Sequence, residues 1–495
     1  MSDSVILSPS PVYFIKSISE QGYTLASAIS DIVDNSIAAS SSRVEILLDT
    51  SEGNLKLYIA DNGKGMTSEE LTENMRIPSA DLDENRQLND LGRFGLGLKT
   101  ASFSQSRKFT VISRTSESNY YEGRTWDVEF LNQTKDWTLK IESLENNESI
   151  VDDFKKVSGE FHSSKPGFEV KTLIIWDNLY KLKKFSKKDE FNDELEELRS
   201  HLSLVFHRYL SSGKLEIRLN NSLVEAFEPF PNNVPGVQVI AENYWQNGNI
   251  YIRFQGIILP KRAATESKES TSPWVPYNRT LEELQGLFVY RNDRLINYGG
   301  WLRTIPKSGY LQFGRLRIDI SNVSDSDFQI NVAKSTLKIP FGLKKAMMEM
   351  IRMVASQATK EYKERVASKV IQVTEGPTGL SLITKQVTGN GIKLKVNGQF
   401  ELMRKLISQL TPEQNDLLDS LVILFEKKLN DIWVGDITVT EIAESPEPAM
   451  LEKIKKIKEF FQQAEYSEDE TRSFLLNSFG TNAESKSFIN NLNFK

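Results

Sequence analysis

A glycine-rich segment at residues 89–105, NDLGRFGLGLKTASFSQ, has the composition of a phosphate-binding loop. It contains three closely spaced glycines, Gly92, Gly95 and Gly97, followed by a stretch that favours a helix. Backbone amides that lead into a helix N-terminus are suited to binding phosphate. Leu98 separates Gly97 from Lys99, which excludes a P-loop, and Thr100 stands where a dinucleotide fingerprint needs its third glycine. The spacing alone is equally typical of a structural turn.

Upstream, residues 24–39, TLASAISDIVDNSIAA, have the apolar spacing of an amphipathic helix. Asp31 and Asn35 are four residues apart and therefore share one side of this helix, whereas Asp34 points in another direction. A capped surface helix has the same pattern. Asp and Asn are mediocre helix formers in mid-helix, however, so their number here indicates a role beyond helix formation.

Two strands are predicted next, at residues 43–48 and 55–60, joined as a hairpin by the polar sequence SEGN. The sequence DNGKGM follows directly at residues 61–66, so that Asp61 stands at a strand end before two glycines. A carboxylate in that position is typical of a ligand-binding site, because functional residues gather where strands pass into loops.

The ordered sequences DIVDN, DNGKGM and GRFGLGLKTAS resemble the motifs of the GHKL superfamily, which includes gyrase B, heat-shock chaperones, sensor histidine kinases, MutL and MORC proteins. The similarity is closest to prokaryotic MORC-like and MutL-like ATPases. It implies an α+β class with a Bergerat ATP-binding sandwich at 1–180. A ribosomal-protein-like transducer at 181–345 and a helical C-terminal region at 346–495 are expected to follow.

The resemblance implies ATP and Mg²⁺ as cofactors, with Asn35 as the magnesium ligand and Asp61 as the acceptor for the exocyclic amine of adenine. A strand threonine, Thr172, is expected to support Asp61, although Lys171 replaces the glycine that usually precedes it. The implied ATP-binding residues are Asn35, Asp61, Gly63, Gly65, Met66, Gly92, Arg93, Phe94, Gly95, Leu96, Gly97, Lys99 and Thr172. Among these, the charge of Lys99 is expected to serve phosphate or a neighbouring subunit.

Asp31 is expected to be the general base, but hydrolysing members of the superfamily usually carry glutamate there. Aspartate is one methylene shorter, a loss of roughly 1.5 Å of reach. A misplacement of about 1 Å can slow a reaction on the order of 100-fold. We therefore expect low turnover through Asp31, with Asp34 as the alternative carboxylate.

Residues 286–296, GLFVYRNDRLI, resemble the central strand–turn–strand of the MutL and MORC transducer. Residues 328–340, FQINVAKSTLKIP, resemble the transducer loop whose lysine reaches the terminal phosphate. The resemblance assigns Lys334 to this second catalytic role, with Lys338 as the rival. A cation that meets only the γ-phosphate would distinguish ATP from ADP.

Elsewhere we expect irregular structure at 11–20, strands at 126–130 and 138–141, an exposed insertion at 143–166 and a linker at 373–392. A second strand-rich region is expected to begin at 214, a helix to span 194–209 and a long helix 341–372. Helices are predicted in the tail at 400–410, 412–429, 449–465 and 468–479.

The 495 residues include no cysteine and three histidines, which excludes thiol chemistry and disfavours a histidine-based metal site. No apolar run approaches the roughly 20 residues of a membrane helix, and no signal peptide is recognisable, so we expect a cytoplasmic protein without a membrane partner. The formal charge of −6 requires any nucleic-acid contact to be a local patch.

Together these features predict a slow ATPase that dimerises on binding ATP and acts as a nucleotide-gated clamp. The family association implies DNA as the clamped partner, with a protein partner in a restriction or anti-phage defence context. The alternatives are an ATP-gated interaction scaffold with little hydrolysis and a chaperone-like clamp on protein clients. A sensor kinase is disfavoured, because no histidine precedes Asn35.

Overall fold

The computed structural model describes most of the chain, in two compact units at residues 1–358 and 359–495. The described residues are 9–20, 22–50, 55–77, 97–159, 168–182, 188–240, 242–247, 250–269, 271–320, 341–375, 379–388, 391–434, 448–463, 467–479 and 483–492. The three-domain division predicted from sequence remains a prediction.

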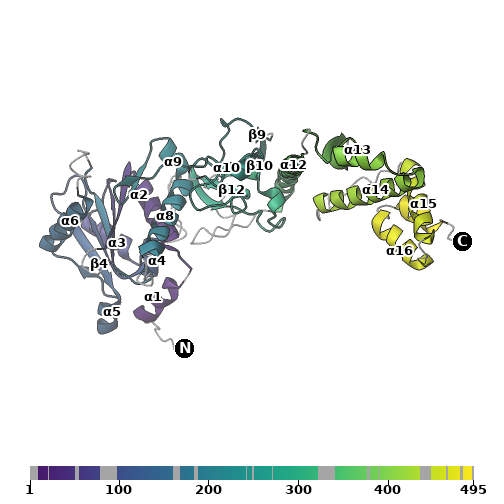
Figure 1. Ribbon diagram of the computed structural model, residues 1–495. Helices are drawn as coiled ribbons and strands as arrows, with labels where there is room; N and C mark the ends of the chain where they lie inside the picture. Colours follow the sequence, from purple (N-terminus) through teal and green to yellow (C-terminus); the bar gives the residue numbers. More distant parts are fainter. Residues whose placement is uncertain are drawn as a thin grey trace, which may run out of the picture. The chain divides into compact units, whose positions relative to one another are not determined.

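The first unit begins with a mixed eight-stranded sheet and its helices (Figure 1). Its strands are β1 (Arg43–Asp49), β2 (Lys56–Asp61), β3 (Ser106–Ser113), β4 (Glu122–Asp127), β5 (Lys140–Ile141), β6 (Thr172–Leu179), β7 (Glu216–Leu219) and β8 (Ser222–Leu223). Its helices are α1 (Pro11–Ser19), α2 (Leu25–Ala38), α3 (Ser68–Met75), α4 (Gly97–Gln105), α5 (Val128–Thr134), α6 (Leu144–Ser158), α8 (Lys188–Val205) and α9 (His207–Ser211). The strand order is β5-β4-β3-β6-β2-β1-β7-β8.

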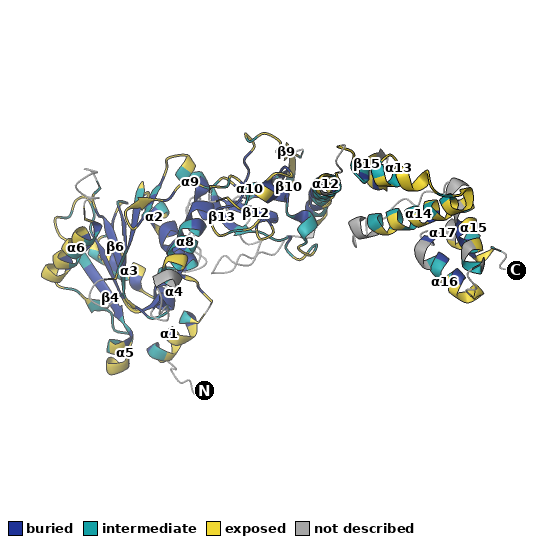
Figure 2. Cartoon of the chain, in the orientation of Figure 1, coloured by how far each residue is buried: buried dark blue, intermediate teal, exposed yellow. Residues whose placement is uncertain are grey.

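Both faces of the central strands β1, β2, β3 and β6 are buried, because their side chains alternate between two apolar clusters. In β2, Leu57 and Ile59 pack on the face shared with α2, α4 and α8, while Tyr58 and Ala60 pack on the opposite face with α6. Figure 2 shows the strands as largely buried and α6 as exposed on its outer side. The predicted α+β class and the β1–β2 hairpin are confirmed.

Four expectations for this region are wrong. Residues 11–20 contain the helix α1, which starts at Pro11 with its preset φ. The supposed insertion at 143–166 contains α6, whose Val151 and Phe154 are fully buried. The strand expected at 126–130 ends at Asp127, because that residue caps α5 with its side chain. The strand β7, expected in the second region, pairs with β1 instead.

A second, six-stranded sheet follows in the same unit. It consists of β9 (Gln238–Val239), β10 (Asn243–Asn247), β11 (Ile250–Ile258), β12 (Gly286–Arg291), β13 (Arg294–Tyr298) and β14 (Gly314–Ile320), with the short helices α10 (Ala263–Glu266) and η3 (Gly309–Leu311). The helix α12 (Phe341–Val373) crosses it closely, since an added Cβ on Gly256 or Gly314 would lie within 3 Å of Val354. The predicted hairpin at 286–296 is confirmed as β12–β13.

The second unit begins within α12 and is mainly helical. It contains β15 (Ile383–Thr388), β16 (Gly391–Val396), α13 (Glu401–Ile407), α14 (Pro412–Val434), α15 (Pro448–Gln463), α16 (Glu468–Phe479) and α17 (Ala483–Asn490). The β15–β16 hairpin replaces much of the linker expected at 373–392, with Ile383 and Leu394 buried against α12 residue Ala367. None of the described helices combines the length and apolar character needed to cross a membrane.

Candidate functional site

The helix α2 carries three of the polar residues singled out from sequence. Thr24 begins it with a capping box, in which its side chain accepts from the backbone of Ser27. Asp31 is buried, and its Oδ2 accepts a hydrogen bond of 2.9 Å from the hydroxyl of Tyr23. Asn35, one turn further on, is exposed, so its amide is accessible to a ligand.

A row of three polar side chains crosses the sheet beside α2. The strand register places Asp61 of β2 opposite Thr172 of β6, and Thr172 opposite Ser113 of β3. The alternation along each strand puts all three on the α2 face, in line with the buried Ile59 and Ile174. The Thr172 and Ser113 hydroxyls are 3.1 Å apart. The register therefore puts Thr172 beside Asp61, while its expected support of an Asp61–adenine contact remains a prediction.

Asp61 is a buried carboxylate whose two oxygens are held differently. Oδ1 accepts the backbone N–H of Gly63 at 2.9 Å, and Oδ2 accepts the hydroxyl of Ser36 at 3.0 Å. Burial raises the pKa of Asp61 to about 6, and the hydrogen bonds from Gly63 and Ser36 oppose that rise. The group is thus mainly ionised at neutral pH, which makes it an acceptor for a buried donor such as an amine.

Two glycines beside Asp61 are required by close backbone approaches. Gly65 has φ +69°, and a Cβ there would lie 1.9 Å from the carbonyl oxygen of Arg114. A Cβ on Gly63 would lie 2.8 Å from the carbonyl oxygen of Ala39. Met66 follows, and its backbone N–H donates to Ser113 Oγ at 3.0 Å. The DNGKGM turn is therefore bonded to both α2 and β3.

The start of α4 lies next to Asp31, since a Cβ built on Gly97 would be 4.0 Å from the Asp31 Oδ2. Lys99 in this helix is buried, and its Nζ donates to the backbone carbonyl of Asn74 at 2.9 Å. Burial lowers the pKa of Lys99 to about 7. Its predicted contact with phosphate or a neighbouring subunit remains a prediction.

Several predicted site residues lie outside the described part of the chain. They are Gly92, Arg93, Phe94, Gly95, Leu96, Lys334 and its rival Lys338. The described residues that the structure brings together are Asp31, Asn35, Asp61, Gly63, Gly65, Met66, Gly97 and Thr172.

Sequence reasoning missed four residues at this site: Tyr23, Ser36, Ser113 and Arg294. Ser36 offered no signal in the spacing, because five residues place it about 140° around the helix from Asp31, and its contact with Asp61 depends on how α2 packs on β2. The fold alone brings the other three residues to their partners, because each lies outside the helix or strand that carries its partner. These pairs are Tyr23 with Asp31, Ser113 with Thr172, and Arg294 with Asp34.

The donor set suits a magnesium nucleotide rather than a metal ion held by protein alone. Within the described residues, no group of three or more His, Cys, Asp or Glu side chains could hold an ion. Magnesium is commonly bound through one or two protein oxygens together with waters and phosphates. The accessible amide of Asn35, the buried acceptor Asp61 and the close backbone turn at Gly63 fit such a ligand.

Residues 23–160 match the family model described as histidine kinase-, DNA gyrase B- and HSP90-like ATPase. This segment is therefore similar to the ATP-binding domain of GHKL ATPases. The matched segment contains Asp31, Asn35, Asp61 and Gly97, so the similarity falls on the same residues that the fold brings together around β2. It ends before Thr172, which reaches the site through β6.

Parts of the chain are also similar to individual proteins, over a long stretch in one case and a short stretch in others. Chaperone protein HtpG of Buchnera aphidicola subsp. Acyrthosiphon pisum is 22% identical over 404 residues, covering 76% of this chain and 59% of that protein. DNA mismatch repair protein MutL of Salmonella arizonae is 36% identical over 113 residues, covering 21% of this chain and 18% of MutL. MutL of Salmonella heidelberg is 37% identical over 113 residues. The chain therefore spans less than two thirds of the length of these relatives.

Proposed function

We propose that this protein binds magnesium ATP at the α2–β2–β6 site, hydrolyses it slowly and dimerises on binding it, as a MORC-like or MutL-like clamp on DNA. The observation that carries the proposal is the buried Asp61 carboxylate, held by Ser36 and Gly63 in line with Thr172. A buried acceptor of this kind selects an amine-bearing base, because an unpaired partner would be costly.

Each described residue has a distinct task in this proposal. Asp61 accepts the exocyclic amine of adenine while Thr172 supports it, and Asn35 offers its amide oxygen to magnesium. Bound magnesium ATP supplies an activated terminal phosphate. Asp31 takes a proton from the attacking water, and the Tyr23 hydroxyl orients that carboxylate through Oδ2. Burial and the neighbouring Asp31 raise the pKa of Tyr23, so this hydroxyl stays protonated and donates.

Asp34 is poorly suited to replace Asp31 as the base. Its Oδ1 is bound at 2.6 Å by Arg294 Nε, and the side chain is 1% exposed. A carboxylate bound to a guanidinium is a weak proton acceptor, because the cation favours its ionised form. This supports Asp31 as the catalytic carboxylate.

The experiment measures ATP binding and phosphate release by the full chain. We expect Asn35→Ala and Asp61→Ala to abolish binding, and Asp31→Ala to retain binding but lose release. Asp152→Ala, at an exposed position of α6, is the matched control and should change neither. Wild-type affinity in both site variants would reject the proposed ATP site. Binding without any release by the native chain would favour the scaffold alternative.

A chaperone-like clamp is the second candidate, because the HtpG similarity covers 76% of the chain and the MutL similarity 21%. DNA retention as a function of salt separates the two. Phosphate contacts give an affinity that falls steeply with salt concentration. Retention at low salt that is lost as salt rises supports the DNA clamp, whereas no retention with ATP present supports a protein client.

Lys334 remains our candidate for the contact to the γ-phosphate. The strand β14 ends at Ile320, paired with Arg291 at the end of β12, and the hairpin beyond Arg291 reaches α2 through Arg294. Ile320, the last described residue before the segment that contains Lys334, therefore lies at the end of the second sheet nearest the site helix. This position is our basis for proposing that a cation of that segment contacts the nucleotide. The proposed DNA partner and defence context rest on resemblance alone.

A further inference from the structure

A buried ion pair joins the site helix to the second sheet. Arg294, the first residue of β13, donates from Nε to Oδ1 of Asp34 in α2 at 2.6 Å. The two side chains are 7% and 1% exposed. Because a charge removed from water is stabilised only by close partners, removing one member of this pair would cost more than breaking a surface ion pair.

Asp34 lies between the two residues of α2 that the proposed function uses. Asn35 is its neighbour, and Asp31 precedes it by three residues. At about 100° per residue, Asp34 lies roughly 60° around the helix from Asp31 and 100° from Asn35. A small rotation of α2 about its axis would therefore move all three side chains together.

Arg294 is itself fixed by its surroundings. Its Nη1 donates to the backbone carbonyl of Leu295 at 3.3 Å, and its guanidinium lies 5.6 Å from the ring centre of Phe206. Phe206 is fully buried at the junction of α8 and α9. The arginine therefore has little freedom to follow Asp34 unless β13 moves as well.

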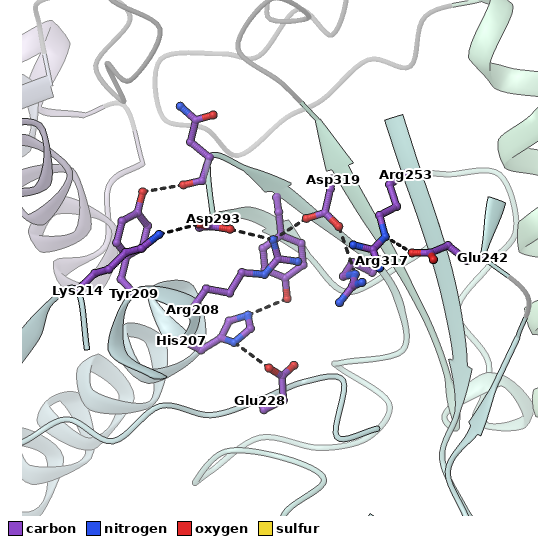
Figure 3. Close-up of polar contacts among 12 residues, drawn as sticks. His207, Arg208, Tyr209, Lys214, Glu228, Glu242, Arg253, Asp293, Arg317 and Asp319 are labelled. Atoms are coloured by element: carbon purple, nitrogen blue, oxygen red, sulfur yellow. Dashed lines mark hydrogen bonds and ion pairs between the residues drawn. The ribbon is translucent and has the colours of Figure 1, made fainter. Parts of the chain in front are cut away.

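The turn that precedes Arg294 is held from a second direction (Figure 3). Asn292 and Asp293 both have positive φ, as in the two-residue turns of tight hairpins. The Tyr209 hydroxyl donates to the Asn292 carbonyl at 2.6 Å, and Arg208 and Lys214 lie within 3.5 Å of the Asp293 carboxylate. The β12–β13 hairpin is thus bonded to α9 at its turn and to α2 just after it.

We propose that Arg294 is a positioning residue that couples the nucleotide site on α2 to the β12–β13 hairpin of the second sheet. The inference rests on the proposed function of that site. A buried pair is a poor way to gain stability alone, since apolar replacements are often as stable. It does fix the register of two elements, so displacement of α2 on nucleotide binding is transmitted to the hairpin.

The test combines kinetics with amide hydrogen exchange in the full chain. In the native protein, a non-hydrolysable ATP analogue with magnesium should slow exchange in both α2 and residues 286–298. Arg294→Met should keep the slowing in α2 and lose it in the hairpin. Its turnover at saturating ATP should fall on the order of 10- to 100-fold, with KM nearly unchanged.

Two further variants keep the result interpretable. Arg294→Lys retains a cation and should recover part of the turnover, which a purely steric defect would not do. Lys214→Met removes an exposed contact to the same turn without touching α2, and should leave turnover and exchange as in the native chain. Should Arg294→Met not fold, the double variant Asp34→Asn/Arg294→Met, which leaves no unpaired buried charge, takes its place.

The outcomes separate the two proposals. Native turnover and an unaltered exchange response in Arg294→Met, or in the double variant, would overturn the coupling. Slowed exchange in α2 of the native chain with no change at 286–298 would also overturn it while leaving ATP binding intact. A native chain that does not bind the analogue would reject the proposed function itself.

Discussion

At the scale of single residues, Asp61 is held in a state that favours ligand binding over stability. Burial is the main reason that its pKa is raised from the usual 3.8 of an aspartate to about 6. Between these two values the folded chain binds a proton that the unfolded chain has released. The free energy of unfolding therefore falls as pH rises through this window, and ionised Asp61 is a destabilising group above it.

Replacing Asp61 by Asn should separate the effect of this carboxylate on stability from its effect on nucleotide binding. At about pH 8 we expect the nucleotide-free variant to gain on the order of 3 kcal/mol of unfolding free energy, because a tenfold difference in proton affinity between the folded and unfolded states corresponds to about 1.4 kcal/mol. ATP affinity should fall on the order of 10- to 100-fold, because an amide replaces a charged acceptor. Denaturant unfolding and nucleotide titration measure the two.

Asp177→Asn is the control for that substitution. Asp177 lies at the other end of β6, is partly exposed and pairs with Lys108 at 3.5 Å. A surface pair of this kind contributes at most about 1 kcal/mol. Equal stability changes in both variants, or an Asp61→Asn chain less stable than the native one at about pH 8, would contradict this account of the carboxylate.

The residues recoverable from sequence were those in local motifs. The apolar periodicity of the sequence predicts both the helix that carries Asp31 and Asn35 and the strand that ends at Asp61. The shared helix face of Asp31 and Asn35 and the strand-end position of Asp61 therefore follow from residue spacing. Ser113 and Arg294 offered no such signal. Their partners, Thr172 and Asp34, are 59 and 260 residues away along the chain. Contacts of that kind depend on sheet order, which composition and periodicity do not fix.

At the scale of elements, the turn after β2 imposes the strictest requirement. Gly65→Ala would place a Cβ on top of the Arg114 carbonyl at positive φ. We expect a loss of at least about 2 kcal/mol in unfolding free energy, from backbone strain of about 1–3 kcal/mol together with the displaced carbonyl. Nucleotide affinity should fall as well, because the same turn carries the bond from Gly63 to Asp61.

Gly309→Ala is the matched substitution, since nothing lies within 4 Å of a Cβ at that position. Its stability should remain within about 0.5 kcal/mol of the native value, as for most surface changes. Thermal or denaturant unfolding measures the unfolding free energy of both variants. Similar losses in the two would show that the contact with the Arg114 carbonyl does not cause the loss in Gly65→Ala.

Element prediction failed where tertiary packing decided the outcome. The polar composition of 143–166 suggested an exposed segment, yet Val151 and Phe154 place α6 against the sheet. β7 was grouped with the strands that follow it in sequence, but the backbone of Glu216 donates to Ser42 at the start of β1. The long periodic helices α2, α12 and α14 needed no such information and were predicted close to their observed bounds.

At the scale of the whole molecule, the proposed clamp predicts a change of assembly state. With a non-hydrolysable ATP analogue and magnesium, the mass in solution should rise from 56.3 kDa to twice that value. Asp61→Ala should stay at the lower mass under the same conditions, because it lacks the acceptor for adenine. Light scattering after size exclusion measures both. A native chain whose mass is insensitive to saturating nucleotide would contradict the clamp.

The row formed by Asp61, Thr172 and Ser113 has a consequence for how errors in this protein would appear. Successive side chains of a strand point to opposite faces, so a slip of β2 by one residue would carry Asp61 away from α2. The same slip would exchange Leu57 and Ile59 with Tyr58 and Ala60 between two buried apolar layers, whose side chains differ in volume. Faulty pairing of β2 would therefore disturb the packing of both layers and remove Asp61 from the proposed nucleotide site at the same time.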